Sequence, residues 1–310
     1  MTRIYVPIDS AALSLGADHV ATAIADEAAK RGIDVQIVRN GSRGLFYLEP
    51  LVQVETAQGR IGYSNVEAED VASLFDAGFH EGQAHAKNVG IVEEIPYLKK
   101  QQRLTFARIG ITDPLSIDDY VALGGLQGLR NALDMNGDAV VEALIDSGLR
   151  GRGGAAFPAG IKWGKTVRAA YADQKYIVCN AEEGDSGTFS DRLVMESDPY
   201  MLIEGMIIAG VTVGATKGYI YVRSEYPHSI ATLNRVIDKA RDAGWLGASV
   251  LGSSHAFELY VAKGAGAYVC GEETALLESL EGRRGIVRVK PPVPALVGLY
   301  GKPTVINNVQ

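Results

Sequence analysis

The stretch that most constrains this chain is rich in glycine and positive charge. Residues 147–163 read Ser-Gly-Leu-Arg-Gly-Arg-Gly-Gly-Ala-Ala-Phe-Pro-Ala-Gly-Ile-Lys-Trp. Glycine lets the backbone adopt φ > 0 and come within hydrogen-bonding distance of a ligand. Backbone N–H groups together with Arg150, Arg152 and Lys162 suit a bound anion, most often a phosphate. No hydrophobic core needs this mixture, so we interpret the stretch as a phosphate-binding loop.

The segment before this loop excludes the standard dinucleotide-binding motif. Gly151, Gly153 and Ala156 formally match the pattern G-x-G-x-x-A. That pattern must follow a β-strand to bind a dinucleotide in the standard way. Here apolar residues at helical spacing predict a helix over 138–147, directly before the loop. We therefore reject a standard Rossmann NAD loop and keep the interpretation of a phosphate cradle.

Composition narrows the class of protein. The 310 residues suffice for about two domains. A net charge of −7 argues against a nucleic-acid partner, and no apolar run reaches the ~20 residues that a membrane span needs. Cys179 and Cys270 are the only cysteines, which indicates a reducing, cytoplasmic setting. Two thiols also exclude an all-cysteine iron–sulfur cluster, and we expect no metal site within residues 1–310. Because the sequence ends in an apolar run without a stop signal, we expect the chain to continue past Gln310.

Residues 1–85 predict a small α/β domain. The residue patterns indicate strands over 3–8, 35–39, 51–55 and 60–63, with helices over 18–31 and 67–78. This order suggests a thioredoxin-like domain without cluster cysteines, which serves as a docking module. An α/β domain of unrelated origin is the alternative.

The next segment shows no clear period. Residues 86–135 include Pro96 and Pro114, and we interpret them as a linker between two domains. His80, Glu81 and His85 just before it are residue types that bind metals. A solvated connector is favoured instead, because no third imidazole or cysteine lies nearby.

Residues 136–310 predict a second α/β domain. Strands are expected over 176–180, 218–223 and 257–262, alternating with helices over 199–214, 229–243 and 272–280. Such alternation indicates a parallel sheet covered by helices. Ligands of these sheets bind beyond the carboxyl ends of the strands.

Polar and glycine-rich segments follow two of these strands. An acidic run occupies 181–187, where carboxylates can accept hydrogen bonds from hydroxyl groups or a carboxamide. A second glycine-rich loop occupies 263–274, and Cys270 within it is better explained by a buried apolar role than as a nucleophile. The segment Lys290-Pro-Pro is expected to be rigid and extended, and to form a pocket wall.

Four motifs resemble one family. Residues 148–163, 180–192, 264–282 and 302–309 resemble the flavoprotein (NADH-binding, FMN) subunit of respiratory complex I. They are equally similar to the corresponding subunits of NAD-reducing hydrogenases and NAD-dependent formate dehydrogenases. The thioredoxin-like domain at the N-terminus looks most like the β (diaphorase) subunit of soluble molybdenum formate dehydrogenases. The resemblance implies a Rossmann-like parallel-sheet domain that binds FMN over 136–310.

The resemblance also implies a set of site residues. The expected FMN ligands are Gly151, Arg152, Gly153, Gly154, Lys162, Asn180, Glu182, Tyr268, Gly271, Glu272, Asn307 and Asn308. Those expected to contact NAD(H) are Phe157, Glu183, Asp185 and Glu273. This chain departs from the family where Lys165 and Val293 stand in place of aromatic residues around the adenine, and where Asp185 is shorter than the usual glutamate.

The implied activity is hydride transfer between NAD(H) and FMN, followed by single-electron exchange with iron–sulfur clusters. A [4Fe-4S] cluster is expected only beyond residue 310. The implied partners are an iron–sulfur and molybdenum α subunit and a [2Fe-2S] γ subunit. Two other function classes compete with this one: a non-catalytic scaffold subunit, and a phosphate-binding transferase. The latter is disfavoured because G-x-x-x-x-G-K-[ST] is absent.

Overall fold

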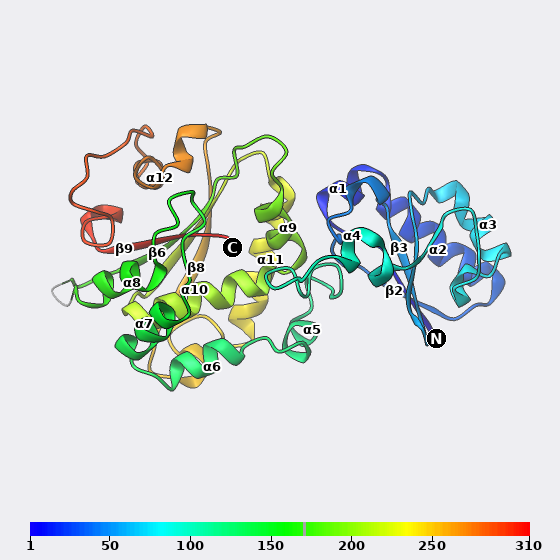
Figure 1. The fold of residues 1–310 in the computed structure, drawn as a ribbon, viewed down its shortest axis with the longest axis horizontal. Helices are drawn as coiled ribbons and strands as arrows, with labels where there is room; N and C mark the ends of the chain where they lie inside the picture. The colour runs from blue at the N-terminus through cyan, green and yellow to red at the C-terminus, as the bar shows by residue number, and fades with distance from the viewer. Residues whose placement is uncertain (170–171) are drawn as a thin grey trace. The chain divides into compact units, whose positions relative to one another are not determined.

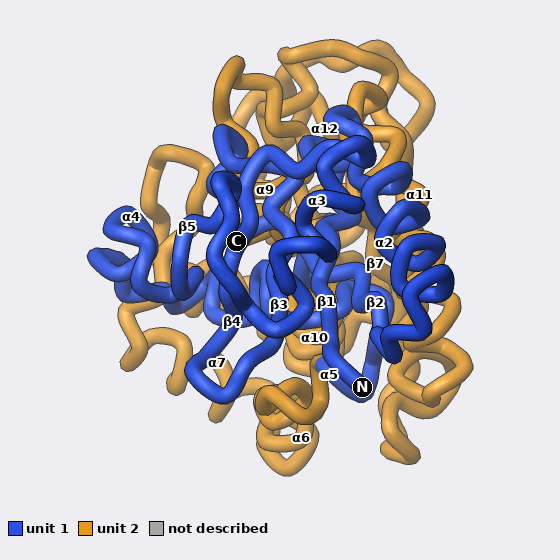
Figure 2. Tube along the Cα trace, turned by 90° about the vertical axis from the view of Figure 1, so that its right-hand side faces the viewer, with its two compact units in different colours: residues 1–119, 196–198 blue, residues 120–195, 199–310 orange. Residues whose placement is uncertain are grey.

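The computed structural model describes residues 1–169 and 172–310, which form two compact units. The first unit comprises residues 1–119 and 196–198, and the second comprises 120–195 and 199–310 (Figures 1 and 2). Both units combine helices with a β-sheet, and the second sheet is wholly parallel. The predicted α/β fold class is therefore confirmed.

The first unit is built on a five-stranded sheet with the order β2-β1-β3-β4-β5. Its strands are β1 (Thr2–Tyr5), β2 (Val35–Val38), β3 (Val52–Thr56), β4 (Gly59–Tyr63) and β5 (Asn88–Ile91). β1 and β2 run parallel because a helix connects them, whereas β3, β4 and β5 pair antiparallel with their neighbours. A parallel βαβ unit followed by an antiparallel hairpin and a helix is the arrangement predicted for this domain.

Four helices of the first unit accompany this sheet. They are α1 (Ser10–Ser14), α2 (Ala17–Arg31), α3 (Val71–Asp76) and α4 (Pro96–Lys99). α2 buries Val20, Ile24 and Ala28 against the sheet and ends at Gly32, whose φ of 67° is the left-handed conformation that glycine adopts without strain. The predicted helix over 18–31 thus lies within one residue of the observed one.

The expected linker, 86–135, is distributed between the two units. β5 adds a strand to the first sheet, and residues up to 119 belong to the first unit. Next come α5 (Ile117–Ala122) and α6 (Gln127–Leu133), and α6 packs against α10 (Pro199–Val213). Glu204 of α10 accepts hydrogen bonds from the backbone N–H of Leu126 and of Leu129. These buried contacts hold a segment in which the sequence shows no period.

The second unit has the strand order β8-β7-β6-β9, all parallel. Its strands are β6 (Tyr176–Ala181), β7 (Lys217–Val222), β8 (Glu258–Lys263) and β9 (Thr304–Asn308). The remaining helices are α7 (Gly137–Asp146), α8 (Ala159–Val167), α9 (Ser190–Ser197), α11 (Pro227–Asp242) and α12 (Glu273–Leu280). Short 3-10 turns lie at 46–48, 68–70, 79–81, 92–94, 250–252, 268–271 and 299–301.

Both faces of the second sheet are covered. Val178 and Ile306 pack with Leu276 of α12 on one face, while α10 and α11 pack on the other. Cys270 is buried in the same cluster as Leu276, so its predicted apolar role is confirmed. Among the described helices we find none with both the length and the apolar character that crossing a lipid bilayer requires.

β9 had no prediction as a strand, yet it sets the position of the site. It pairs with β6 so that Cys179 lies opposite Asn307 and Asn180 opposite Asn308. Three amide side chains are therefore brought to the carboxyl ends of two neighbouring parallel strands. This is the sheet edge where α/β proteins bind their ligands.

Candidate functional site

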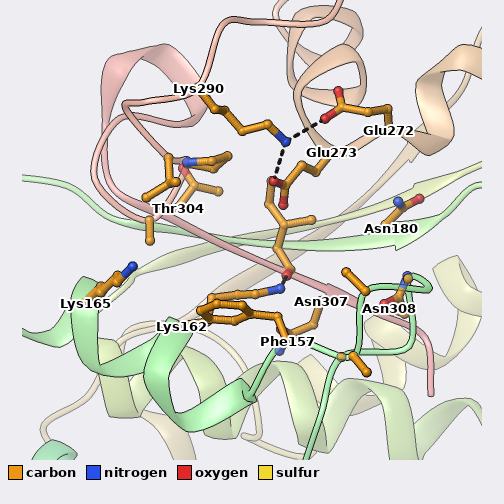
Figure 3. Close-up of a pocket in the computed structure, with 18 of the residues that line it drawn as sticks. Phe157, Lys162, Lys165, Asn180, Glu272, Glu273, Lys290, Thr304, Asn307 and Asn308 are labelled. Carbon is orange, nitrogen blue, oxygen red and sulfur yellow. Dashed lines mark hydrogen bonds and ion pairs between the residues drawn. The ribbon is translucent and has the colours of Figure 1, made fainter.

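A pocket of about 440 Å³ opens at the carboxyl ends of β6 and β9 (Figure 3). Ligand pockets usually have about 300–1,000 Å³. Its lining comes from the first glycine loop, α8, the strand ends, the second glycine loop and the proline-rich segment. The lining residues are Gly151, Gly153, Ala155, Ala156, Phe157, Lys162, Lys165, Asn180, Gly271, Glu272, Glu273, Lys290, Val293, Pro294, Ala295, Thr304, Ile306, Asn307 and Asn308.

Most of the predicted site residues lie together in this pocket. From the predicted FMN set, the pocket gathers Gly151, Gly153, Lys162, Asn180, Gly271, Glu272, Asn307 and Asn308. From the predicted NAD(H) set it gathers Phe157 and Glu273. The predicted residues outside the lining are Arg152, Gly154, Glu182, Glu183, Asp185 and Tyr268.

The first glycine loop is fastened to itself and to β9. Gly151 N–H donates to Phe157 O at 2.8 Å, which closes the loop at its base. Arg152 N–H donates to Asn308 Oδ1 at 3.2 Å. Gly154 has φ 92°, which side chains rarely adopt, so the turn requires glycine there. A Cβ on Gly153 would meet the Asn308 amide at 3.5 Å, so any larger side chain at 153 extends toward the pocket.

Lys162 and Asn180 tie the walls of the pocket together. Lys162 Nζ donates to Ile306 O at 2.7 Å, and burial lowers the pKa of this lysine. Asn180 Nδ2 donates to Gly271 O at 2.8 Å and so connects β6 to the second glycine loop. Both polar ends are consequently held in place before any ligand binds.

Glu182 carries an unsatisfied oxygen beside the pocket. Its Oε2 is buried without a hydrogen-bond partner among the described residues, and burial raises the pKa of the carboxyl. A Cβ on Gly271 would meet Glu182 Cγ at 3.7 Å, so this carboxylate lies next to a residue of the pocket lining. Buried polar atoms are normally hydrogen-bonded. An acceptor left open at the rim of a glycine-lined pocket fits a ligand with N–H or hydroxyl donors, such as a flavin.

Glu272 and Glu273 share one lysine. Glu272 Oε2 accepts the backbone N–H of Thr274 at 2.8 Å and of Ala275 at 2.9 Å, so it caps α12. Lys290 Nζ lies 3.0 Å from Oε1 of Glu272 and 3.0 Å from Oε1 of Glu273 (Figure 3). The lysine thereby closes one side of the pocket.

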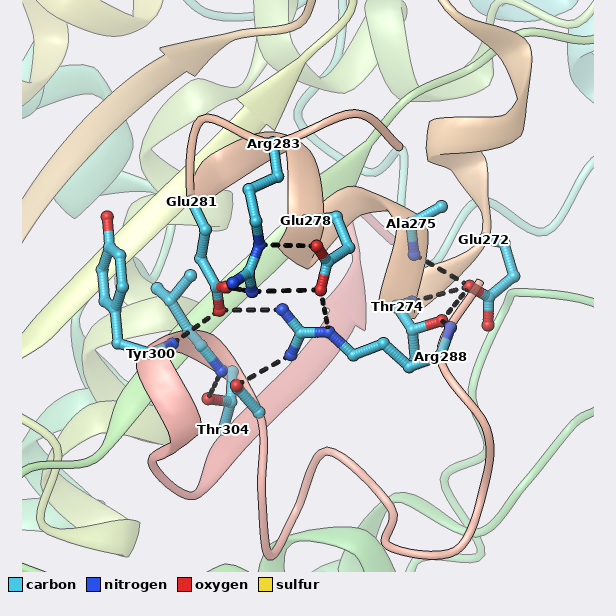
Figure 4. A network of polar contacts seen from close by, with 11 residues as sticks. Glu272, Thr274, Ala275, Glu278, Glu281, Arg283, Arg288, Tyr300 and Thr304 are labelled. Atoms are coloured by element: carbon cyan, nitrogen blue, oxygen red, sulfur yellow. Dashed lines mark hydrogen bonds and ion pairs between the residues drawn. The ribbon is translucent and has the colours of Figure 1, made fainter. Parts of the chain in front are cut away.

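The segment that carries Lys290 is anchored by charge. We call residues 283–298 the strap. Arg288 pairs with Glu278 at 2.5 Å and with Glu281 at 2.8 Å, and it donates to Gly298 O at 3.0 Å (Figure 4). Arg283 pairs with the same two glutamates of the α12 end. The predicted pocket wall at 290–292 thus lies in place because the strap is bound to α12.

Glu183 is placed differently from the expectation that it faces a nicotinamide. Its side chain is 6% exposed and lies outside the pocket lining. The carboxylate accepts the backbone N–H of Asp191 at 2.9 Å and of Arg192 at 3.1 Å, and the hydroxyl of Tyr226 at 3.1 Å. These donors occupy it because the first turn of α9 and the phenol point at the same buried site.

Asp185 and Tyr268 join the two loops outside the pocket lining. Tyr268 Oη donates to Asp185 Oδ1 at 2.8 Å, and the tyrosine is 70% exposed. The ring lies over Gly184, where a Cβ would come within 2.5 Å of it. The acidic run after β6 and the second glycine loop are therefore in contact.

Sequence reasoning missed part of the lining. Pro294, Ala295, Thr304 and Ile306 carry no chemical motif, and only the pairing of β9 with β6 brings two of them to the pocket. Lys165 and Val293 were noticed only as departures from a family pattern. Within residues 1–169 and 172–310, no cluster of histidine, cysteine or acidic residues has the arrangement of a metal site, which includes the region of His80 and His85.

Comparison with known proteins identifies the family. Residues 144–310 match the family model described as the Nuo51 FMN-binding domain. The chain belongs to this family. FMN is accordingly the cofactor of the Nuo51-type domain in the second unit, and the matched range begins just before the first glycine loop and includes the entire pocket lining.

Curated relatives of this Nuo51-type chain come from two kinds of complex. It is 52% identical over 212 residues to the HndC component of the NADP-reducing hydrogenase of Solidesulfovibrio fructosivorans, covering 68% of this chain and 43% of that protein. It is 51% identical over 195 residues to a flavoprotein-type component of the NADH-quinone oxidoreductase of Aquifex aeolicus, covering 63% and 45%. The chain thus spans less than half the length of these relatives.

A solved structure resembles both units. A crystal structure of an NAD⁺-reducing [NiFe]-hydrogenase in the H₂-reduced state superimposes with a TM-score of 0.55 at 26% identity. The match covers 99% of this chain and 51% of that one. The first unit is therefore included in the similarity, although the family model begins only at residue 144.

Proposed function

We propose that the second unit transfers hydride between NAD(H) and FMN. The observation that carries this proposal is that two glycine loops, three strand-end amides and Glu272 and Glu273, far apart in sequence, line one pocket. A scaffold subunit without a ligand has no need of such a pocket. The relatives named as components of an NADH-quinone oxidoreductase and an NADP-reducing hydrogenase support the same reaction class.

The residues that hold FMN in this proposal are those of the first glycine loop and the strand ends. Gly151 to Gly154 supply backbone N–H groups to the ligand, with Arg152 and Lys162 balancing negative charge. Asn307 and Asn308 offer amide donors at the same end. Asn180, Glu182 and the Gly271-Glu272 segment, together with Tyr268, face its other polar groups. The bound flavin supplies a redox centre that accepts two electrons together and gives them up singly.

The dinucleotide is held by residues at the pocket mouth. Phe157, half exposed in the lining, offers a ring on which a base can stack. Glu273 and Asp185 offer carboxylate oxygens to hydroxyl or carboxamide donors. The protein's contribution to hydride transfer is to position the two reactants, since this reaction needs no acid–base pair. Glu183 serves by fixing α9 and the acidic run, because its oxygens are already occupied.

For the complex in which the module works, we propose a cytoplasmic NAD-dependent formate dehydrogenase. Its expected partners are an iron–sulfur and molybdenum α subunit and a [2Fe-2S] γ subunit, with a [4Fe-4S] cluster beyond residue 310. A first unit without cysteines supports this assignment. The second candidate is an NAD(P)-reducing hydrogenase, which the similarity to HndC and to the NAD⁺-reducing hydrogenase favours. Formate-dependent against H₂-dependent NAD⁺ reduction by the complex purified with its own subunits distinguishes the two.

The proposal is tested by blocking the first glycine loop. Gly153→Val places two methyl groups beyond a Cβ that already contacts Asn308, so we expect loss of the yellow flavin absorbance and of NADH-dependent dye reduction. The matched control is Gly205→Val on α10, where a Cβ meets nothing within 4 Å. A yellow, fully loaded Gly153→Val protein would remove the loop from the flavin site. Colourless wild-type protein would instead support the scaffold.

A further inference from the structure

One of the three lysines in the pocket stands apart from the other two. Lys162 Nζ is engaged by a backbone carbonyl, and Lys290 by two carboxylates. Lys165 Nζ has a single described contact, which places it 5.8 Å from the centroid of the Phe157 ring. In the described parts of the chain, no ion pair or hydrogen bond of the Lys165 side chain is found.

The charges of the lining do not balance without a ligand. The lining contains three lysines and two glutamates, Glu272 and Glu273. Because Lys290 already pairs with both carboxylates, the positive charge of Lys165 is left without a nearby counter-charge in the lining. An exposed ammonium group of this kind attracts an anionic part of a ligand.

Lys165 lies at the end of the pocket opposite to the strand-end amides. In Figure 3, Lys165 and Asn308 are drawn at opposite sides, with Phe157 between them. Phe157 lies just before the start of α8, and Lys165 lies in its last turn, so both positions are set by the same helix. A ligand that stacks on the Phe157 ring is therefore within reach of the Lys165 ammonium group.

We propose that Lys165 binds a phosphate group of the pyridine dinucleotide. The inference rests on the proposed function, which assigns the Phe157 end of the pocket to that ligand. A dinucleotide offers phosphate in two places: the pyrophosphate, which NAD(H) and NADP(H) share, and the 2′-phosphate, which only NADP(H) carries. A point-charge donor on a flexible stem suits either group. Lys165 is then a determinant of dinucleotide affinity, and of NADP(H) use if the 2′-phosphate is the group bound.

The test is calorimetric binding to the intact chain, which needs no turnover. The probes are ADP-ribose, its 2′-phosphate derivative and adenosine, titrated into wild type, Lys165→Met and Lys165→Arg. The matched control is Lys217→Met, because Lys217 is an exposed lysine at the amino end of β7, away from the carboxyl ends where the pocket opens. We expect Lys165→Met to weaken phosphate-containing probes about three- to tenfold, as for a partly exposed charge pair. Lys165→Arg should restore most of the affinity, and adenosine should bind all variants alike.

Each outcome decides the proposal. An equal loss for both phosphate-containing probes supports contact with the pyrophosphate, and a loss confined to the 2′-phosphate derivative supports contact with that group. Unchanged affinities in Lys165→Met, or an equal loss with adenosine, overturn the inference while leaving the proposed function in place. Wild-type protein that binds none of the three probes overturns the proposed function itself.

Discussion

The sharpest prediction concerns Glu183, which the sequence associates with the dinucleotide and the structure places in a structural role. Its Oε1 accepts from Asp191 N–H and its Oε2 from Arg192 N–H, so both oxygens are committed to the first turn of α9. Glu183→Gln replaces one acceptor with an NH₂ group that faces a backbone donor. The Tyr226 hydroxyl competes for the oxygen that remains.

The cost follows from these contacts. A buried N–H group that loses its acceptor costs about 1–3 kcal/mol. Removing a negative charge from the start of a helix costs about 0.3–1 kcal/mol more. The sum of about 1–4 kcal/mol corresponds to a melting temperature lower by about 2–16 °C for a unit of this size. Glu183→Ala removes every acceptor and is expected to destabilise further.

The assay is thermal unfolding followed by circular dichroism, without dinucleotide. Glu225→Gln is the matched control, because it removes a neighbouring carboxylate whose pair with Arg223 is exposed and whose loss costs about 1 kcal/mol at most. A Glu183→Gln protein that melts with wild type but binds NADH more weakly would refute the structural role. It would return Glu183 to the dinucleotide site.

Three further predictions concern other parts of the chain. Asp185→Ala should raise the Michaelis constant for NADH several-fold while FMN stays bound, measured by steady-state dye reduction; an unchanged constant would remove Asp185 from the site. Arg288→Met should speed hydrogen exchange of the strap, because it breaks two ion pairs and a hydrogen bond to Gly298; equal exchange in both proteins would contradict the anchoring role. Burial, followed by the nearby Asp9 charge, raises the pKa of Glu49 to about 7. Its unfolded pKa is lower, so stability is greatest below about pH 4.3 and falls as the pH rises to about 7, by about 3 kcal/mol at most. Hydrogen exchange of β1 amides, corrected for intrinsic rates, should show this slope, and Glu49→Gln should flatten it; a slope that the variant retains would exclude Glu49 as its source.

Local signals predicted the elements of this chain well. Glycine after an apolar period ended α2 where expected, and the run Asp198-Pro199 marked the start of α10. The first three strands of the second sheet were predicted within one or two residues, because each is a short apolar run between turn signals. In contrast, the segment over 86–135 shows no period. It is held by contacts such as those of Glu204, which lies far from it in sequence.

Residue chemistry by itself determined that the chain carries an anion-binding glycine loop, a second glycine loop and polar residues at strand ends. It determined this because glycine, lysine and amide side chains have few other uses in such density. Only the tertiary structure decided which carboxylates remain available to a ligand. Glu182 keeps an open oxygen, whereas Glu183, the next residue, is occupied by the start of a helix. The alternation of a chain leaving a strand sends neighbouring side chains to opposite environments, and hydrogen-bond partners that lie distant in sequence determine which of the two stays free.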